Sequence, residues 1–376
     1  MTAEPLIFKY LTEMGRQNAT DLYLTVGVPP TLRIDDQLVA VSDVVMDSAQ
    51  MNDVLAAILT TRQRRDFEMR MELNTAIDMG GHGRFRVNIL QQRLQPALVI
   101  RRIISRIPSF AELRLPPVLE KLALMKRGLI LVTGMTGSGK STTLASMVDY
   151  RNSNSQGHII TIEDPIEYYH EHKKCVVSQR EVGVDTENYA VALKNALRQR
   201  PDVILVGEVR DRDVMEQALT AAETGHLCLA TIHTNNAHQA IERIVNLFPE
   251  EYAPQIRLNL ATNLRAIISQ RLVRTTQGSL AVAMEVMLNE GLVKDLIMEG
   301  KISKISEVME SNQVVGMVTF DQSLLRLYVD GLISEDMAIS QSDMPSDMKL
   351  KIQKIRLGEA HGGLSSVDTS VLKISE

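Results

Sequence analysis

The chain has 376 residues, a length that favours two domains, and its 44% hydrophobic content allows a sizeable core. A formal net charge of −5 and a 4% aromatic content disfavour a broad nucleic-acid-binding surface. There is no apolar run long enough to span a membrane, no secretory-signal profile and no paired cysteine motif, so we expect a cytoplasmic protein without a structural zinc site.

The first hundred residues predict a mixed α+β domain with an antiparallel sheet. Apolar residues recur at helical spacing over 4–17, and residues 21–26 alternate like a strand. Further strands are expected up to residue 104, which ends the predicted first domain, 1–104. The proline-containing stretch 105–117 then predicts a semi-rigid linker.

Arginines are the notable side chains of this domain. Arg84 and Arg86 face the same side of one expected strand, and Arg101 and Arg102 lie on the next. Exposed arginines are usually only solvated. The alternative is that some of them reach a phosphate across a subunit boundary, since an arginine finger supplied in trans stabilises charge on a transferred phosphoryl group. The pattern alone leaves both interpretations open.

From residue 118 onward strand and helix patterns alternate, which predicts a parallel sheet covered on both faces. The stretch GMTGSGKST at 134–142 lies between an apolar strand and a helix, the context that a P-loop requires, and a glycine-rich loop with a chance lysine fits this context poorly. Glycines let backbone N–H groups face phosphate oxygens, and Lys140 would reach the β- and γ-phosphates while Ser141 ligates Mg²⁺. The expected ligands are ATP and Mg²⁺, and the expected binding residues are Gly134, Thr136, Gly137, Ser138, Gly139, Lys140, Ser141 and Thr142.

Three later strands of this series end in polar residues. Glu163 follows the first, where a carboxylate could orient or activate the attacking water, although a solvated acidic loop is the alternative. Glu208 ends the second in the manner of a Walker B carboxylate, which handles Mg²⁺ directly or through water. His233 ends the third and could sense the γ-phosphate, although a lone histidine is more often a satisfied polar residue.

The rest of the sequence contains fewer candidate functional residues. We expect a helix at 252–268, and strands at 269–274 and 280–287. The predicted ATPase core spans 118–290, a helical subregion spans 291–342, and the polar tail 343–376 is expected to be mobile.

Four boxes give the chain a resemblance to a known family: GMTGSGKST at 134–142, ITIEDPIE at 160–167, ILVGEVRD at 204–211 and TGHLCLATIHTNNA at 224–237. Over nearly its whole length the chain resembles the type IV pilus retraction ATPases, the PilT/PilU group of secretion ATPases. The resemblance implies an α/β chain, with a PAS-like N-terminal α+β domain followed by a RecA-like P-loop ATPase domain. It also implies a homohexameric ring that hydrolyses ATP to power pilus retraction and twitching motility.

The resemblance implies a role for each matching residue. Lys140 and Ser141 would bind phosphate and Mg²⁺, Glu163 would be the catalytic glutamate, and Glu208 would be the Walker B acid. His233 and His226 would be the His-box residues, and Arg84 and Arg101 would approach the nucleotide phosphates from the N-terminal domain. The implied partners are further copies of the chain, a PilT-like retraction ATPase and the platform protein of the inner membrane, to which the ring would be peripheral.

One difference from the family's sequence pattern indicates which branch of the family the chain resembles more. A motif with two arginines that matters for retraction in PilT-type members corresponds here to residues 292–299, where Lys294 and Met298 replace the arginines. Lysine keeps the charge without the bidentate fork, and methionine keeps neither. The chain is therefore more similar to the accessory, PilU-like branch of the group.

Two other classes of function remain open at this stage. A nucleotide-binding adaptor ring could stabilise a partner motor without working itself, but the acids at 163 and 208 disfavour a dead enzyme. A RecA-like motor could translocate a nucleic acid, but the acidic charge and the few aromatic residues disfavour it.

Overall fold

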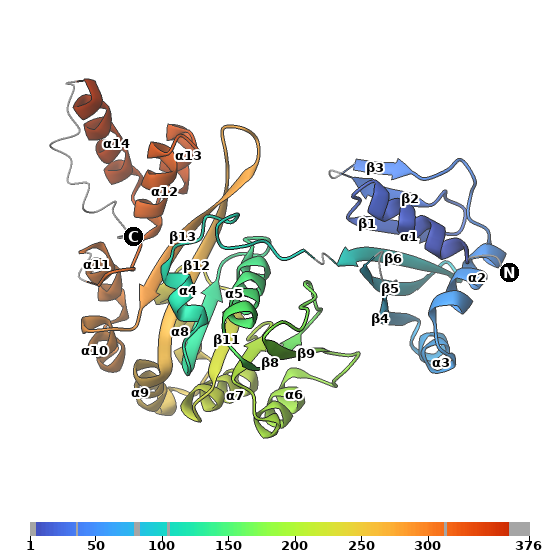
Figure 1. Cartoon of the computed structure of the whole chain (residues 1–376), viewed down its shortest axis with the longest axis horizontal. Coiled ribbons are helices and arrows are strands. Elements are labelled where there is room, and N and C mark those ends of the chain that lie inside the picture. The colour runs from blue at the N-terminus through green and yellow to red at the C-terminus, as the bar shows by residue number, and fades with distance from the viewer. Residues whose placement is uncertain (1–4, 35–36, 79–82, 104–105, 312–313, 361–376) are drawn as a thin grey trace. The chain divides into compact units, whose positions relative to one another are not determined.

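The computed structural model describes residues 5–34, 37–78, 83–103, 106–311 and 314–360 (Figure 1). Its packing divides the chain into two units, Met1–Arg106 with Ile166–Tyr169, and Ile107–Pro165 with His170–Glu376. Each unit has its own hydrophobic core. Within the described ranges, no helix has both the length and the apolar character that crossing a bilayer demands.

The first unit is built on a six-stranded antiparallel sheet with the strand order β3-β2-β1-β6-β5-β4. Alternate residues of its strands point into one core, such as Phe85, Val87 and Ile89, and three helices pack apolar residues into the same core. Its elements are α1 Leu6–Arg16, β1 Asp21–Thr25, β2 Thr31–Ile34, β3 Gln37–Ala40, α2 Ser48–Ile58, α3 Thr61–Arg70, β4 Glu72–Asp78, β5 Arg84–Gln92 and β6 Gln95–Ile103.

The second unit is a layered α/β structure. Its helices are α4 Val118–Ala123, α5 Lys140–Asn154, α6 Tyr189–Ala196, α7 Arg212–Glu223, α8 Ala237–Asn246, α9 Ala253–Asn263, α10 Leu292–Glu299, α11 Ile305–Glu310, α12 Phe320–Val329, α13 Glu335–Gln341 and α14 Pro345–Ala360, with short 3-10 turns at Leu197–Gln199, Glu250–Tyr252 and Ile302–Lys304. Its strands are β7 Gly128–Thr133, β8 Gly157–Glu163, β9 Cys175–Glu181, β10 Val203–Val206, β11 Leu227–Ile232, β12 Leu264–Arg274 and β13 Leu280–Leu288.

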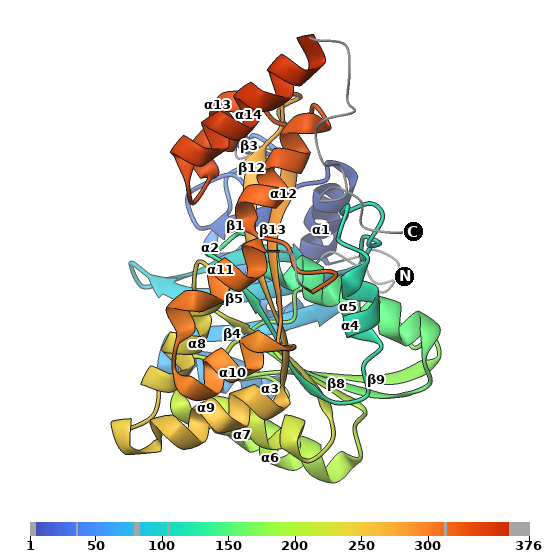
Figure 2. The same ribbon diagram turned by 90° about the vertical axis from the view of Figure 1, so that its left-hand side faces the viewer.

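These strands form one sheet in the order β13-β12-β7-β11-β10-β8-β9, parallel throughout except for the edge strand β13. Every residue of β7, β10 and β11 is buried, as expected for a parallel sheet with helices on both faces. Helices α4 and α5 pack together on one face, and α6 to α9 pack along the other (Figures 1 and 2). The sheet and its two helical layers surround one large core.

The predicted helix at 252–268 is wrong in its second part, because helix α9 ends at Asn263 and strand β12 begins at Leu264. The apolar stretch at the start of this strand has a hydrophobic pattern that fits a buried helix as well as a strand. Its pairing with β7 and β13 decides the conformation. Strand β9 and helix α6 were not predicted, since neither contains a motif.

The stretch expected as a linker, 105–117, is packed for most of its length. Residues from Ile107 onward belong to the second unit, where Phe110 is buried and stacks on Tyr150 with ring centroids 5.0 Å apart. Pro108 accepts a hydrogen bond from Ser146 Oγ through its carbonyl oxygen at 2.7 Å. The expected linker is therefore largely part of the second unit.

The expected mobile tail is wrong for residues 345–360, which form helix α14, and residues 361–376 lie outside the described part of the chain. Met348 and Ile352 of α14 are fully buried, in a small core that also contains Phe320 and Leu324 of α12. The distal parts of β12 and β13 complete this core through Val273 and Ala283. The helix is mainly polar, and the two buried residues at i and i+4 are too few to reveal it in the sequence. This is why the composition suggested a tail.

Candidate nucleotide-binding site

Four predicted boxes meet at one edge of the second sheet. Strands β7, β8, β10 and β11 run parallel, so their carboxyl ends lie side by side. The P-loop follows β7, Glu163 ends β8, Glu208 comes two residues after β10, and His233 follows β11. Ligands of open α/β sheets bind in the crevice outside the carboxyl ends of the strands. The topology therefore gathers these side chains where such a ligand binds.

The P-loop has the backbone geometry that phosphate binding requires. Gly134 has φ of 147°, and a Cβ atom there would lie 2.4 Å from Ser138 Oγ and 2.6 Å from the carbonyl oxygen of Gln270. Gly139 has φ of 87° and precedes helix α5, whose N-terminus has no side-chain cap in the described structure. A helix N-terminus without such a cap can offer its N–H groups to an anion.

Two side chains of the loop support the same interpretation. Lys140 Nζ donates hydrogen bonds to the carbonyl oxygens of Gly134 and Met135, at 2.9 and 3.0 Å. Ser138 Oγ is buried and has no hydrogen-bond partner in the described structure. A buried polar atom without a partner is costly unless a ligand satisfies it. Ser141 and Thr142 lie in the first turn of α5, beside Lys140.

The two acids and the histidine are held by specific contacts. Glu163 Oε1 accepts hydrogen bonds from Thr161 Oγ1 at 2.6 Å and from Gln179 Nε2 at 3.3 Å. Glu208 Oε1 lies 3.0 Å from Nε2 of His233. Burial, and then the Lys140 cation, lower the pKa of His233 below its usual value. The imidazole is thus predominantly neutral at pH 7, and it contacts Glu208 at the edge of the cavity that the P-loop also lines.

Arg210 is a site residue to which the sequence analysis gave no role. Its Nε and a terminal nitrogen contact Glu208 Oε2, both at 2.7 Å, and its other terminal nitrogen lies 3.7 Å from Asp164 Oδ2. Arg210 therefore bridges the second and third boxes, and both oxygens of Glu208 are engaged. Its position two residues after the Walker B acid is the signal that could have identified it.

A second missed feature lies between β8 and β10. A Cβ atom on Gly207 would lie 2.8 Å from Tyr189 Oη and 3.1 Å from Glu163 Cα. Burial and the nearby carboxylate of Asp164 raise the pKa of Tyr189, so its hydroxyl stays protonated. Glycine at 207 is thus what allows Tyr189 and Glu163 to approach the Walker B segment. No sequence motif indicates Tyr189, because it lies on a helix that was not predicted.

An open cavity of about 610 Å³ adjoins the P-loop. Residues 134–136 of the loop and 233–235 of the His box line it, together with Gln239, Glu242, Arg243 and Asn246 of helix α8. Most of the residues that line it have polar side chains, among them the charged Glu242 and Arg243. The cavity lies beside the loop predicted to hold the phosphates.

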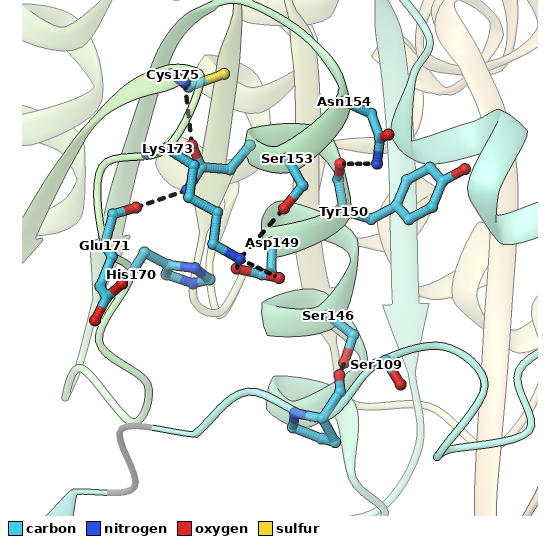
Figure 3. Close-up of polar contacts among 12 residues, drawn as sticks. Ser109, Ser146, Asp149, Tyr150, Ser153, Asn154, His170, Glu171, Lys173 and Cys175 are labelled. Carbon is cyan, nitrogen blue, oxygen red and sulfur yellow. Dashed lines mark hydrogen bonds and ion pairs between the residues drawn. The ribbon is translucent and has the colours of Figure 1, made fainter.

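The P-loop helix is tied to the structure around it (Figure 3). Asn152, fully buried near the end of α5, donates to the carbonyl oxygen of Glu171 at 2.7 Å and accepts from the backbone N–H groups of Lys173 and Cys175, at 3.2 and 3.1 Å. Lys173 Nζ also pairs with Asp149 at 2.7 Å. These contacts fix the far end of the helix that begins at the phosphate loop.

Three predicted residues lie on other elements than these strand ends, and one of them, His226, belongs to the same unit. His226 precedes β11, at the opposite end from His233, and the six strand residues between them hold the two about 23 Å apart. Arg84 and Arg101 lie on β5 and β6 of the first unit. Arg101 Nε donates to Oδ1 of Asp21 at 2.8 Å, so an ion pair holds its side chain on that sheet.

The donor set fits a nucleotide with Mg²⁺. Ser141 supplies a hydroxyl in the first turn of α5, and Glu208 supplies carboxylate oxygens, the hard ligands that Mg²⁺ prefers. Within the described residues, no group of three or more His, Cys, Asp or Glu side chains could hold a metal by itself. A magnesium ion here would thus depend on the phosphates and water for most of its ligands.

Comparisons with known proteins agree with this geometry. The family described as type II/IV secretion system protein matches residues 2–329. Type IV pilus ATPase PilU of Pseudomonas aeruginosa is 47% identical over 346 residues, which are 92% of this chain and 91% of the relative. The type IV pilus retraction ATPase PilT of the same organism is 40% identical over 91% of this chain and 99% of its own.

Among solved structures, that of the pilus retraction motor PilT with bound ADP superposes with a TM-score of 0.86 and 41% identity, covering 92% of this chain and all of the other. This likeness confirms the predicted fold class, an N-terminal α+β domain followed by a RecA-like ATPase domain. The long family match, the relatives over most of both chains and the P-loop site agree, and the chain belongs to the type II/IV secretion system protein family.

Proposed function

We propose that the chain is an ATP-hydrolysing motor component of type IV pilus retraction and twitching motility, in the accessory role of PilU-like proteins. One observation carries the proposal: the P-loop, Glu163, Glu208 and His233 converge at one sheet edge, in a chain 47% identical to a type IV pilus ATPase. The ADP in the PilT structure supports a nucleotide as the ligand here.

The reaction class is the hydrolysis of ATP to ADP and phosphate. Water attacks the γ-phosphorus in line, and the bond to the bridging oxygen of ADP breaks, so catalysis comes from positioning and from stabilising the developing charge. Lys140 and the backbone N–H groups of 134–142 would hold the phosphates. Glu163, fixed by Thr161 and Gln179, would orient the attacking water and take up its proton.

Ser141 and Glu208 would hold Mg²⁺, directly or through water. The ion, when bound, neutralises charge on the β- and γ-phosphates. His233 would sense whether the γ-phosphate is present and transmit this to Glu208, since its imidazole already contacts that carboxylate. Arg84 and Arg101 would approach the phosphates from an N-terminal domain; Arg101 would first have to leave Asp21.

The proposed assembly is a homohexamer at the cytoplasmic face of the inner membrane. Hydrolysis around the ring would act on the platform protein at the base of the pilus, with a PilT-like ATPase as partner and no nucleic acid involved. The accessory role is supported by helix α10, where Lys294 and Met298 lie exposed four residues apart, on one face. They occupy the positions of two arginines in the PilT-type motif.

The test combines turnover with retraction in cells. Glu208→Ala should abolish ATP hydrolysis by the purified chain, and cells in which this variant is the sole accessory ATPase should lose the accessory contribution. Retention of that contribution without hydrolysis would favour an adaptor ring instead. Cells with the wild-type chain as their sole retraction ATPase should retract pili only when a PilT-like partner, even one unable to hydrolyse ATP, is supplied. Retraction without the partner would contradict the accessory role.

A further inference from the structure

A row of buried polar side chains crosses the second sheet beneath the His box. Ser269 of β12 lies opposite Glu285 of β13 and opposite Thr133 of β7, and Thr133 lies opposite Ile232 of β11. Residues opposite each other on paired strands share a face of the sheet. Glu285 is 7% exposed, and Ser269 and Thr133 are fully buried.

This row holds the turn that follows His233 at two points. Thr133 Oγ1 donates to the carbonyl oxygen of Thr234 at 2.6 Å, immediately after His233. Glu285 Oε1 accepts from the backbone N–H of Ala237 at 2.7 Å, at the start of helix α8, and from Ser269 Oγ at 3.0 Å. The segment between His233 and α8 is therefore pinned at both ends from the sheet.

Stability alone does not account for the row. The pKa of Glu285 is raised to about 6, mainly by burial and also by Asp343, although its two hydrogen bonds and Arg271 act in the opposite direction. A carboxylate with a raised pKa opposes folding when it ionises, and apolar residues at such positions are often neutral or stabilising. A buried acid at this place therefore calls for a role beyond packing.

We propose that Glu285 and Thr133 are positioning residues for ATP hydrolysis: they hold the turn 234–237 and thereby fix the imidazole of His233 against Glu208. The inference rests on the proposed function, because it requires His233 to act in turnover. It adds Thr133, the last residue of β7 before the P-loop, and Glu285 of β13, which contact the end of the His box at Thr234 and Ala237.

The test is steady-state ATP hydrolysis by the purified full chain with Mg²⁺. Glu285→Leu removes the acceptor, and we expect kcat to fall about tenfold or more while KM for ATP changes less than about threefold, since misplacement of a catalytic group costs rate and the P-loop is untouched. Glu285→Gln keeps an acceptor oxygen and should retain kcat within about threefold. Asn154→Ala is the control, because that amide bonds only Tyr150 of its own helix.

A second comparison separates positioning from a general structural effect. In a His233→Ala background, Glu285→Leu should change kcat by less than about twofold, because residues that act through one group are not additive. The inference is overturned if Glu285→Leu has wild-type kcat, or if its full effect persists without His233. If Glu285→Leu does not fold, Thr133→Val, which removes only a hydroxyl, is judged by the same two readouts. Failure of the proposed function would show differently, as wild-type turnover in Glu208→Ala.

Discussion

Asn152→Ala offers a quantitative test of how the P-loop helix is anchored. The substitution removes three hydrogen bonds to the backbone of residues 171, 173 and 175. The N–H of Cys175 is buried and would lose its partner, which costs about 1–3 kcal/mol. The other two contacts are partly exposed and contribute about 0.5–1.5 kcal/mol each, since water can replace them. We expect a loss of about 3 kcal/mol for the ATPase unit.

Thermal unfolding followed by circular dichroism measures this loss. For a unit of this size, about 2 °C per kcal/mol predicts a decrease in Tm of about 6 °C. The matched control is Asn154→Ala on the same helix, whose exposed amide bonds only the carbonyl oxygen of Tyr150, and its Tm should stay within about 1 °C. Protein concentration is kept equal, because assembly also shifts Tm. Equal melting of the two variants would refute the anchoring role of Asn152.

Three further predictions follow from close contacts and from burial. Glu285→Gln removes an acid whose pKa is about 6 in the folded state, against an ordinary value of 4.5. The stability of the wild type relative to the variant should therefore be highest below pH 4.5 and fall by about 2 kcal/mol as the pH rises through 6. Urea unfolding at pH 4.5 and 7.5 measures this change, and a difference that does not depend on pH would contradict it. Gly207→Ala places a Cβ atom 2.8 Å from Tyr189 Oη, which should displace Glu163 and lower ATP turnover about tenfold. Adding Tyr189→Phe removes the hydroxyl and should restore part of the turnover. If it restores none, the contact with Tyr189 is not the cause of the loss. Gly134→Ala should weaken binding of a fluorescent ATP analogue at least about tenfold, since its Cβ atom would lie 2.4 Å from a side-chain oxygen of the loop, and unchanged affinity would argue against the loop as the phosphate site.

The nucleotide site could be predicted largely from the sequence, because its parts are local. The P-loop is a strand, a glycine-rich turn and a helix within about 25 residues, and all three are found where predicted. Glu163 and Glu208 follow buried strands whose apolar runs are recognisable, and parallel pairing brings such strand ends together. Their roles in catalysis remain predictions, as do those of Arg84 and Arg101.

Contacts between distant segments could not be predicted in this way. Strand β12 opens with an apolar stretch that suits a buried helix as well as a strand, and its pairing with β7, more than 130 residues earlier, decides which forms. Helix α14 was mistaken for a tail because, among its residues 345–357, only Met348 and Ile352 are fully buried. In both cases long-range packing overrides a weak local preference.

The sequence by itself determined the phosphate loop, the acids that accompany it and the α/β class, because each depends on residue types at short spacing. Only the tertiary structure decided that Glu285, Ser269 and Thr133 form one row beneath the His box, and that Arg210 bridges Glu208 and Asp164. The physical reason is strand register. Ser269 lies opposite Glu285 of the neighbouring strand β13 and opposite Thr133 of β7, which is more than 130 residues earlier, and no local pattern encodes the second pairing.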